Sequence, residues 1–465
     1  MKKPWVAPFL SPHQVGALNK FGLRPLRGEY QDQIEGHSIE QLVRSYGSPL
    51  FVTSESRLRH NARRLKRAFQ AHYPNVVHGW SYKTNYTSAV CNILHQEGCW
   101  AEVVSRFEYE KARKLGVPGP RILFNGPHKP LPILRRAIAD GAHLHVDHLD
   151  ELAAIESIAQ ERGQVVPVTL RLNLNTGYSE PWSRFGFNLE SGEAHEAARR
   201  IELSPHLRLT GLHSHIGTFI LEPRAYAEQV RLMCEFMAWL EQDGQLRIES
   251  LDIGGGLPSQ NALQGVYLPP AQVVAEIEHY AEVIGGALHQ GLGYRLQADL
   301  PLPLLIVESG RAVVDDAQQL ITSVVGSKRL PDGRRAAVLD AGVNTLFTAF
   351  WYHHQIKLTR PPVGPPQEQV LYGPLCMNID VIRSSIQIAP LHQGDRLLIS
   401  PVGAYNNTQW MQFIEYRPAI VLIQEDGAVS VIRRAENLDV MCAQDELPEH
   451  LAQPDPQPWR QAILA

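Results

Sequence analysis

The chain has 465 residues, more than one ordinary hydrophobic core holds, and this length suits two domains. Hydrophobic residues make up 44% and charged residues 20%, which is the balance of a globular chain rather than a disordered one. The formal net charge is −4 and charges of both signs are interspersed, so neither a nucleic-acid-binding surface nor a polybasic membrane patch is expected.

The cysteines and the start of the chain indicate the compartment. The five cysteines are widely spaced and form no C-x-x-C pair, which argues against a disulfide framework or a structural zinc site. Pro4, Pro8 and Pro12 interrupt the first apolar residues, so no signal peptide is expected. No run reaches the roughly 18 apolar residues of a membrane span. The sequence therefore predicts a cytoplasmic protein without a membrane segment.

Short apolar runs alternate with longer amphipathic segments from about residue 49 to residue 310. In segments such as 56–73 and 222–242, apolar residues recur at three- and four-residue spacing, as in amphipathic helices. Eight strands with intervening helices predict an α/β fold, a parallel (β/α)8 barrel, although a doubly wound sheet would give the same alternation. The predicted strands lie at 49–54, 76–84, 121–126, 144–148, 168–175, 209–217, 248–256 and 304–311.

A different pattern begins after about residue 311, where strand-like segments follow one another with turn residues between them. The residues around 425–428 favour a hairpin, and the Pro-rich stretch 360–369 favours a surface loop. We therefore expect an N-terminal segment (1–45), a barrel (46–311) and a C-terminal, mostly antiparallel β domain (312–465). The predicted strand segments of that last domain are 317–330, 335–342, 384–390, 395–405 and 418–436.

The first polar motif, Ser81-Tyr82-Lys83-Thr84-Asn85, closes a predicted barrel strand. A β/α barrel builds its active site at the carboxyl ends of its strands. Burial there would lower the pKa of Lys83 and free its amine for imine formation. Taken alone, the same pattern also fits a surface lysine.

Two histidines, His213 and His215, lie in the motif HSHIGT. Their i, i+2 spacing places both on one side of a strand. One ring could stack on a flat heterocycle, both could bind a metal, or both could be hydrogen-bonded core residues.

A glycine-rich segment, DIGGG, follows the next strand, with Gly254, Gly255 and Gly256 after Asp252. Without Cβ atoms the backbone N–H groups can approach and cradle a phosphate, or the segment can be a tight turn.

The motif ESGR ends the last predicted barrel strand. Arg311 could clamp phosphate oxygens, and Glu308 could keep a pyridine nitrogen protonated, although an ordinary surface ion pair also fits. In the second domain, GPLCMNID and GAY place Cys376, Asp380 and Tyr405 in strand-ending loops.

The ordered series SYKTN, HSHIGT, DIGGG, ESGR, GPLCxxxD and GAY resembles the barrel-type pyridoxal-phosphate decarboxylases, the group of diaminopimelate and ornithine decarboxylases. The series spans nearly the whole chain. The resemblance implies pyridoxal 5'-phosphate as cofactor and an amino acid as substrate. It also implies an obligate head-to-tail homodimer with shared active sites, and residues 1–45 packing with the β domain.

The resemblance assigns a role to each motif residue. Lys83 would hold the cofactor as a Schiff base, and Cys376 would reach into the site of a second copy and return a proton after carbon dioxide departs. Glu308 would pair with the pyridine nitrogen, His215 would stack on the ring, and Glu102 matches an acidic residue near the lysine. The phosphate would be held by Thr218, Gly254, Gly255, Gly256, Arg311 and Tyr405.

Two positions depart from the family pattern. The residue after the catalytic cysteine is Glu in diaminopimelate decarboxylases and Asp in ornithine decarboxylases, where it binds the distal amine, but here it is Met377. Thr348 stands where diaminopimelate decarboxylases carry an arginine for the distal carboxylate. With Tyr352 and Asp380 as further substrate-binding candidates, we expect a neutral or conjugated amino acid of specialised metabolism. A larger neutral pocket could be lined by Trp351, Tyr352, His353, His354, Asn406, Asn407, Gln409 and Trp410.

Other functions remain open at this point. Diaminopimelate decarboxylation is one alternative, and a metal-dependent barrel hydrolase using His213 and His215 is another. The hydrolase would leave Lys83, DIGGG and ESGR without roles. An inactive regulatory relative is disfavoured by the intact Lys83 and Cys376, and a racemase on the same cofactor is disfavoured by GPLCxxxD. The main hypothesis requires no metal.

Overall fold

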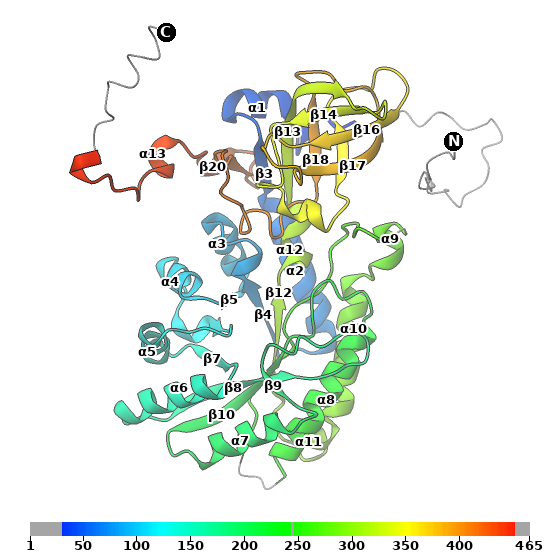
Figure 1. The fold of residues 1–465 in the computed structure, drawn as a ribbon. Coiled ribbons are helices and arrows are strands. Elements are labelled where there is room, and N and C mark those ends of the chain that lie inside the picture. The colour runs from blue at the N-terminus through cyan, green and yellow to red at the C-terminus, as the bar shows by residue number, and fades with distance from the viewer. Residues whose placement is uncertain (1–29, 243–245, 267, 452–465) are drawn as a thin grey trace, which may run out of the picture.

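The computed structural model describes residues 30–242, 246–266 and 268–451, which form a barrel with a second sheet stacked above it (Figure 1). In these ranges eight parallel strands follow the order β10-β11-β12-β4-β5-β6-β7-β8, and the pairing of β8 with β10 closes the ring. The predicted α/β barrel is confirmed. Its strands are β4 (Val76–Ser81), β5 (Trp100–Val103), β6 (Ile122–Phe124), β7 (His143–Val146), β8 (Val166–Asn173), β10 (Leu207–Ser214), β11 (Ser250–Asp252) and β12 (Leu304–Ser309).

Amphipathic helices surround the barrel (Figure 1). The first, α2, begins where the side chain of Ser54 accepts a hydrogen bond from the backbone of Arg57, and it buries Leu58, Leu65 and Phe69 on one face. The main helices are α2 (Glu55–His72), α3 (Ser88–Gln96), α4 (Arg106–Lys114), α5 (Leu131–Asp140), α6 (Leu149–Glu161), α7 (Glu193–Leu203), α8 (Arg224–Leu240) and α10 (Ile277–Gly291).

One predicted barrel strand belongs elsewhere. Residues 49–54 are expected to open the barrel, but β3 (Leu50–Ser54) pairs with β13 (Gln318–Arg329) and β19 (Ala419–Ile423) of the second sheet. The eighth place in the barrel is taken by β5, whose four residues end next to Val104. Both segments are short and apolar, so their hydrophobicity alone did not distinguish them.

The second sheet is mostly antiparallel, as predicted, and its order is β17-β16-β14-β13-β3-β19-β20; off this path, β18 pairs with β13, and β15 pairs with β18. The predicted hairpin around residues 425–428 is confirmed by the antiparallel pairing of β19 with β20. The strands after the barrel are β13 (Gln318–Arg329), β14 (Arg335–Leu339), β15 (Gln355–Leu358), β16 (Gln367–Tyr372), β17 (Val381–Ile388), β18 (Arg396–Ser400), β19 (Ala419–Ile423) and β20 (Val429–Arg433).

The described part of the N-terminal segment lies against this second sheet. Tyr30 forms a bridge with Leu358, and Ile39 and Leu42 of α1 (Ile39–Tyr46) share an apolar cluster with β3. Residues 1–29 of the predicted N-terminal segment and residues 452–465 of the predicted β domain lie outside the described residues.

The barrel has one apolar core, and the second sheet has two apolar clusters that contain alternating residues of β3 and β13. A small cluster of Phe219, Val274 and Tyr352 lies where the barrel's carboxyl end meets the β domain. Within the described ranges, no helix combines the length and the apolar character needed to cross a membrane. All five cysteines are free.

Candidate active site

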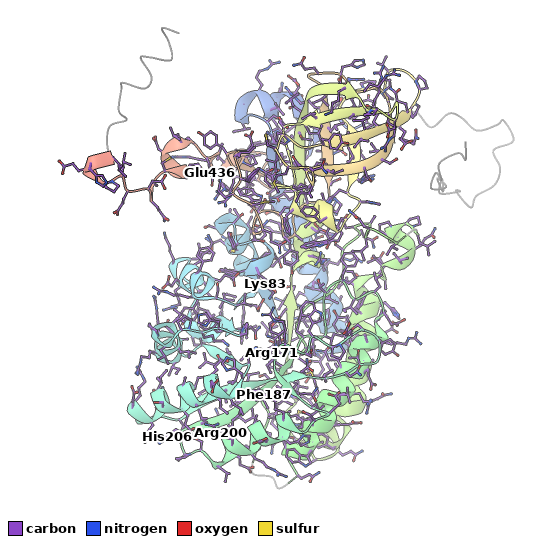
Figure 2. All side chains as sticks on the ribbon, in the orientation of Figure 1. Lys83, Arg171, Phe187, Arg200, His206 and Glu436 are labelled. Atoms are coloured by element: carbon purple, nitrogen blue, oxygen red, sulfur yellow. The ribbon has the colours of Figure 1, made fainter. Side chains whose placement is uncertain are left out.

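A cavity of about 720 Å³ lies between the carboxyl ends of the barrel strands and loops of the β domain. Figure 2 shows Lys83 at the end of the barrel near the β domain, whereas Arg200 and His206 lie at the opposite end. The predicted site residues among its lining are Lys83, His215, Thr218, Gly255, Gly256, Glu308, Arg311, Tyr352 and Tyr405. The four barrel motifs and Tyr405 therefore converge on one cavity, while the role of each residue stays a prediction.

Lys83 lies in a short 3-10 turn directly after β4, and its Nζ donates to the fully buried carboxylate of Glu102 on β5. Burial tends to lower the pKa of Lys83, but the charges of Glu102 and Glu308 outweigh it and raise the pKa above its usual value. The prediction of a lowered pKa was therefore wrong, because it left out these carboxylates. Burial and Glu308 also raise the pKa of Glu102, so Glu102 can accept the proton that the Lys83 ammonium gives up on becoming a neutral amine.

Asn125, at the end of β6, links the two carboxylates. Its Nδ2 donates to Glu102 at 3.1 Å and also to Glu308. His213 Nε2 lies 3.3 Å from the same oxygen of Glu308. Glu308 is thus held in place at the floor of the cavity. The sequence analysis missed Asn125, although a polar residue at the end of a predicted barrel strand was a usable signal.

His215 presents a neutral ring to the cavity. Its Nδ1 accepts a hydrogen bond of 2.9 Å from the backbone N–H of Gly255. Burial, more than any other cause, lowers its pKa from 6.5 to about 3. Trp182, from the loop between β8 and β9 (Phe187–Asn188), approaches the same ring at 5.3 Å between centroids. A flat, uncharged ring in this place suits stacking on an aromatic heterocycle.

The glycine segment after β11 allows no side chains. Gly254 and Gly256 have φ angles of 67° and 96°, in the left-handed region that favours glycine. A Cβ atom on Gly255 would lie 2.6 Å from the carbonyl oxygen of Glu308. The backbone therefore packs closely under the cavity, as a phosphate-binding loop requires.

Arg311 has an unused donor beside this loop. Its Nη2 donates to Thr218 Oγ1 at 2.8 Å, but its Nη1 is buried and has no hydrogen-bond partner among the described residues. Its guanidinium lies over the ring of Tyr405, 4.9 Å from the centroid. A buried guanidinium donor without an acceptor is costly, and a phosphate oxygen would satisfy it. Together with His215 and Glu308, Arg311 fits a phosphorylated, flat, nitrogen-containing cofactor.

Tyr352 is the predicted substrate residue that reaches the cavity, together with its neighbour Trp351. Thr348, in contrast, is fully buried in the turn η4 (Phe347–Phe350). Its hydroxyl donates to Asn406 at 2.9 Å and lies 2.8 Å from His354 Nε2. Thr348 is thus bonded within the β domain and does not line the cavity.

The predicted loop between β16 and β17 lies outside the cavity of its own chain. Cys376 is exposed, and Met377 packs against the core of the β domain. Asp380 is buried and accepts hydrogen bonds of 2.8 Å from the backbones of Val343 and Leu375. Asp380 therefore shapes this loop, and its assignment to substrate binding stays a prediction.

The wall of the cavity is largely aromatic, which the motifs did not indicate. Of the neutral pocket residues expected from the sequence, Trp351, Tyr352 and Gln409 line it. His354, Asn406 and Asn407 instead form hydrogen bonds inside the β domain, and Trp410 packs 5.8 Å from Phe51. The aromatic side chains missed by the sequence analysis are Trp182, Phe219 and Phe350.

Comparison with known proteins gives consistent results. Residues 57–315 match the family described as "Pyridoxal-dependent decarboxylase, pyridoxal binding domain". The diaminopimelate decarboxylase of Methanothermobacter thermautotrophicus is 30% identical over 90% of this chain and 96% of its own length. The crystal structure of diaminopimelate decarboxylase from M. jannaschii with L-lysine has a TM-score of 0.80 and 27% identity, covering 91% of this chain and 98% of that one. Lysine/ornithine decarboxylase from Vibrio vulnificus, complexed with putrescine, gives a TM-score of 0.69 at 25% identity, covering 84% and 98%.

Proposed function

Because the chain belongs to the pyridoxal-dependent decarboxylases, we propose that this carboxy-lyase removes a carboxyl group from diaminopimelate or a close analogue. Its cofactor is pyridoxal phosphate. The observation that carries the proposal is the convergence of Lys83, Glu308 and Arg311 on one cavity in a chain similar to diaminopimelate decarboxylases over 90% of its length. The similarity favours this alternative over the conjugated substrate expected from the sequence, and it replaces the barrel hydrolase.

Each residue then has a defined task. When bound, pyridoxal phosphate supplies the electron sink for the carbanion that decarboxylation leaves. Lys83 anchors the cofactor, and Arg311 with the glycine segment holds its phosphate. Glu308, fixed by Asn125, keeps the pyridine nitrogen protonated. Glu102 takes the proton of Lys83 when the amine must be neutral.

The reprotonating group is Cys376 of a second copy in this proposal. Cys376 is exposed and lies outside the cavity of its own chain, which leaves it accessible to another subunit. A head-to-tail homodimer with shared sites would give each site one such cysteine from its partner. The homodimer with shared sites is part of the proposal.

One observation favours a second candidate substrate, an amino acid with a neutral or conjugated side chain. Among the described residues that line the cavity, the cations are Lys83 and Arg311, both already assigned to the cofactor. Thr348 is engaged inside the β domain. A distal carboxylate would therefore find no cation from this chain, whereas the aromatic wall suits an uncharged group.

The two candidates are separated by kcat/KM for carbon dioxide release from diaminopimelate, ornithine, lysine, neutral amino acids and amide conjugates. If diaminopimelate is the substrate, its kcat/KM should exceed that of each other compound by at least ~100-fold. A compound that leaves a buried charge of the site unpaired loses several kcal/mol of binding free energy, and 1.4 kcal/mol corresponds to a tenfold change. A neutral or conjugated amino acid as the best substrate would favour the second candidate. No release from any α-amino acid would contradict both.

Position 377 provides a further check. Met377→Glu should raise kcat/KM for substrates with a distal ammonium, and Met377→Gln is the matched uncharged control. Under the second candidate, Met377→Glu alone should not make diaminopimelate a good substrate, because Thr348 still offers no positive charge to the distal carboxylate.

A further inference from the structure

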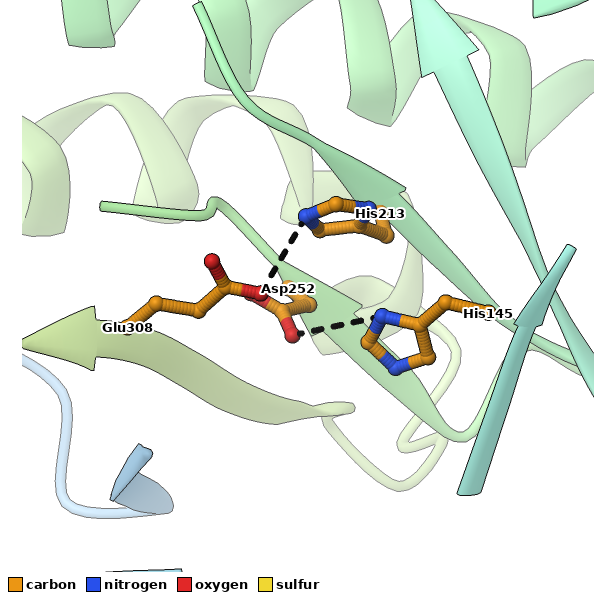
Figure 3. Close-up of side chains that lie close together, drawn as sticks. All are labelled: His145, His213, Asp252 and Glu308. Carbon is orange, nitrogen blue, oxygen red and sulfur yellow. Dashed lines mark ion pairs between the residues drawn. The ribbon is translucent and has the colours of Figure 1, made fainter. Parts of the chain in front are cut away.

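Four ionisable side chains meet inside the barrel (Figure 3), and one of them, Glu308, also lines the cofactor cavity. His145 comes from β7, His213 from β10, Asp252 from β11 and Glu308 from β12. Each offers one nitrogen or oxygen atom, and these atoms all lie within 4.8 Å of one another. His213 Nε2 is 3.3 Å from Glu308, and His145 Nδ1 is 3.8 Å from Asp252. All four side chains are at least 97% buried.

Several of these atoms have no hydrogen-bond partner among the described residues. They are Nδ1 of His145, both ring nitrogens of His213 and Oδ2 of Asp252. A buried polar atom without a partner costs about 1–3 kcal/mol. The cost is largest when several such atoms face one another, as here, and one shared ligand would satisfy them together.

The nearby cations are paired outside the cluster. Those whose charges reach His213 are Arg171, Lys83 and Lys129. Each of those three cations already has a carboxylate of its own, whereas no Lys or Arg in the described ranges pairs with Asp252 or Glu308. The existing pairs are Lys83–Glu102, Lys129–Glu151 and Arg171–Asp147.

We propose that His145, His213, Asp252 and Glu308 bind one zinc-type divalent cation in the chain before it takes up pyridoxal phosphate. Two imidazoles and two carboxylates form a ligand set that suits tetrahedral Zn²⁺. Bonds of about 2.0–2.2 Å place neighbouring ligand atoms roughly 3.3 Å apart, the separation already present between His213 and Glu308.

The cation and the cofactor exclude one another. This mutual exclusion rests on the proposed function, in which Glu308 pairs with the pyridine nitrogen. A dication on Glu308 removes that partner and repels a protonated nitrogen. A side cavity of about 230 Å³ that reaches Lys83, His213 and Glu308 gives the ion a path. Zinc would therefore occupy the cofactor-free protein and slow the uptake of pyridoxal phosphate.

The test uses the full chain with and without pyridoxal phosphate, and Co²⁺ as a spectroscopic substitute for Zn²⁺. The cofactor-free chain should bind one Co²⁺ with the visible absorption of tetrahedral coordination, and Zn²⁺ should displace it. The chain loaded with pyridoxal phosphate should bind none. Zn²⁺ at tenfold its Kd should slow cofactor uptake about tenfold, since only the metal-free fraction accepts the cofactor.

Two variants locate the site. His145→Leu and Asp252→Asn should lose the Co²⁺ absorption yet still take up pyridoxal phosphate, because neither residue is assigned to the cofactor. His143→Leu, on the same strand but stacked on Trp100 at the other end, is the matched control and should keep the absorption.

The outcomes separate the two proposals. Absence of tetrahedral Co²⁺ absorption in the wild-type chain, its persistence in both cluster variants, or equal cofactor uptake with and without Zn²⁺ would overturn the metal site. The wild-type competition requires no substitution, so a variant that fails to fold leaves the test intact. A chain that binds Co²⁺ as described but never takes up pyridoxal phosphate would instead contradict the proposed function.

Discussion

The rim of the barrel and the loops of the β domain contribute very differently to the same cavity. At the rim, Lys83, His215, Glu308 and Arg311 come from three separate strands and all face the cavity, because parallel strands end at a common edge. In the β domain, Tyr352 and Tyr405 reach the cavity.

The remaining predicted residues of the β domain are used differently. Thr348 and Asp380 form hydrogen bonds within their own domain, and Cys376 and Met377 lie outside the cavity. Under the proposed function, one chain would hold the cofactor with its own residues, and a second copy would supply Cys376.

The largest expected effect is a loss of activity on substitution of Lys83 at the rim of the barrel. Lys83→Ala should lower decarboxylation by roughly 10³-fold or more, since both the covalent anchor and a proton-transfer group are removed. It should also abolish the visible absorption band of lysine-bound pyridoxal phosphate. Lys83→Arg is the matched control, because it keeps a cation beside Glu102 but cannot form an imine. Either variant keeping the band and the activity would remove Lys83 from the proposed role.

The next effect tests whether the β domain acts across subunits. Cys376→Ala should lower the activity by about 10²-fold through loss of the proton donor. Mixing Cys376→Ala with Lys83→Ala under conditions of subunit exchange should restore part of the activity, because a heterodimer has one site with both residues intact. Mixtures that stay inactive despite exchange, verified by mass spectrometry of tagged subunits, would place both residues in the same chain's site.

A smaller effect concerns the phosphate. Arg311→Ala should raise the Kd of pyridoxal phosphate by about 10–100-fold, since hydrogen bonds to charged groups contribute about 1.5–3 kcal/mol. Arg311→Lys should lie between Ala and wild type, because it restores the charge but not the forked geometry. The measurement is an equilibrium titration followed by absorbance. Unchanged Kd values in both variants would mean that the unpaired Nη1 serves another ligand.

The smallest expected effect is on the free energy of unfolding, and it is tested with one buried histidine from each region. Burial lowers the pKa of both His78 and His354 from 6.5 to about 3. In the barrel, both ring nitrogens of His78 lack hydrogen-bond partners among the described residues, whereas His354 is bonded to Thr348 and to the carbonyl of Pro401. His78→Leu should therefore raise the free energy of unfolding at pH 7 by about 1–3 kcal/mol, and His354→Leu should lower it by a similar amount.

The pH dependence of these two variants has a defined sign. Below pH 6.5 the unfolded chain binds a proton that the folded histidine refuses, so stability is lost as the pH falls from about 6.5 towards 3. The gain from His78→Leu should grow over this window. Urea titrations at pH 7 and pH 5 measure it. A His78→Leu chain less stable than wild type at both values would show that its ring nitrogens have partners in solution.

Particular residues show how far sequence reasoning reached. The alternation of strands and helices predicted an α/β fold, the resemblance carried by the ordered motifs favoured the barrel over a doubly wound sheet, and the strand-ending motifs predicted which side chains share its rim. Leu50–Ser54 was assigned to the barrel because the hydrophobicity of a short strand does not indicate which sheet the strand joins; it pairs with strands of the second sheet. Asn125 and Trp182 were missed because neither lies in a motif, although both line or shape the site.

The sequence by itself determined the fold class, the family and the cofactor, because these depend on periodicity and on residue types in a fixed order. Tertiary structure alone decided that the pKa of Lys83 is raised and that Thr348 forms its hydrogen bonds within the β domain. It also decided that His145 lies beside Asp252. Each depends on a contact between residues far apart in the chain. The charge, hydrogen bonding and exposure of a side chain depend on its neighbours in space, and these neighbours cannot be read from its position in the sequence.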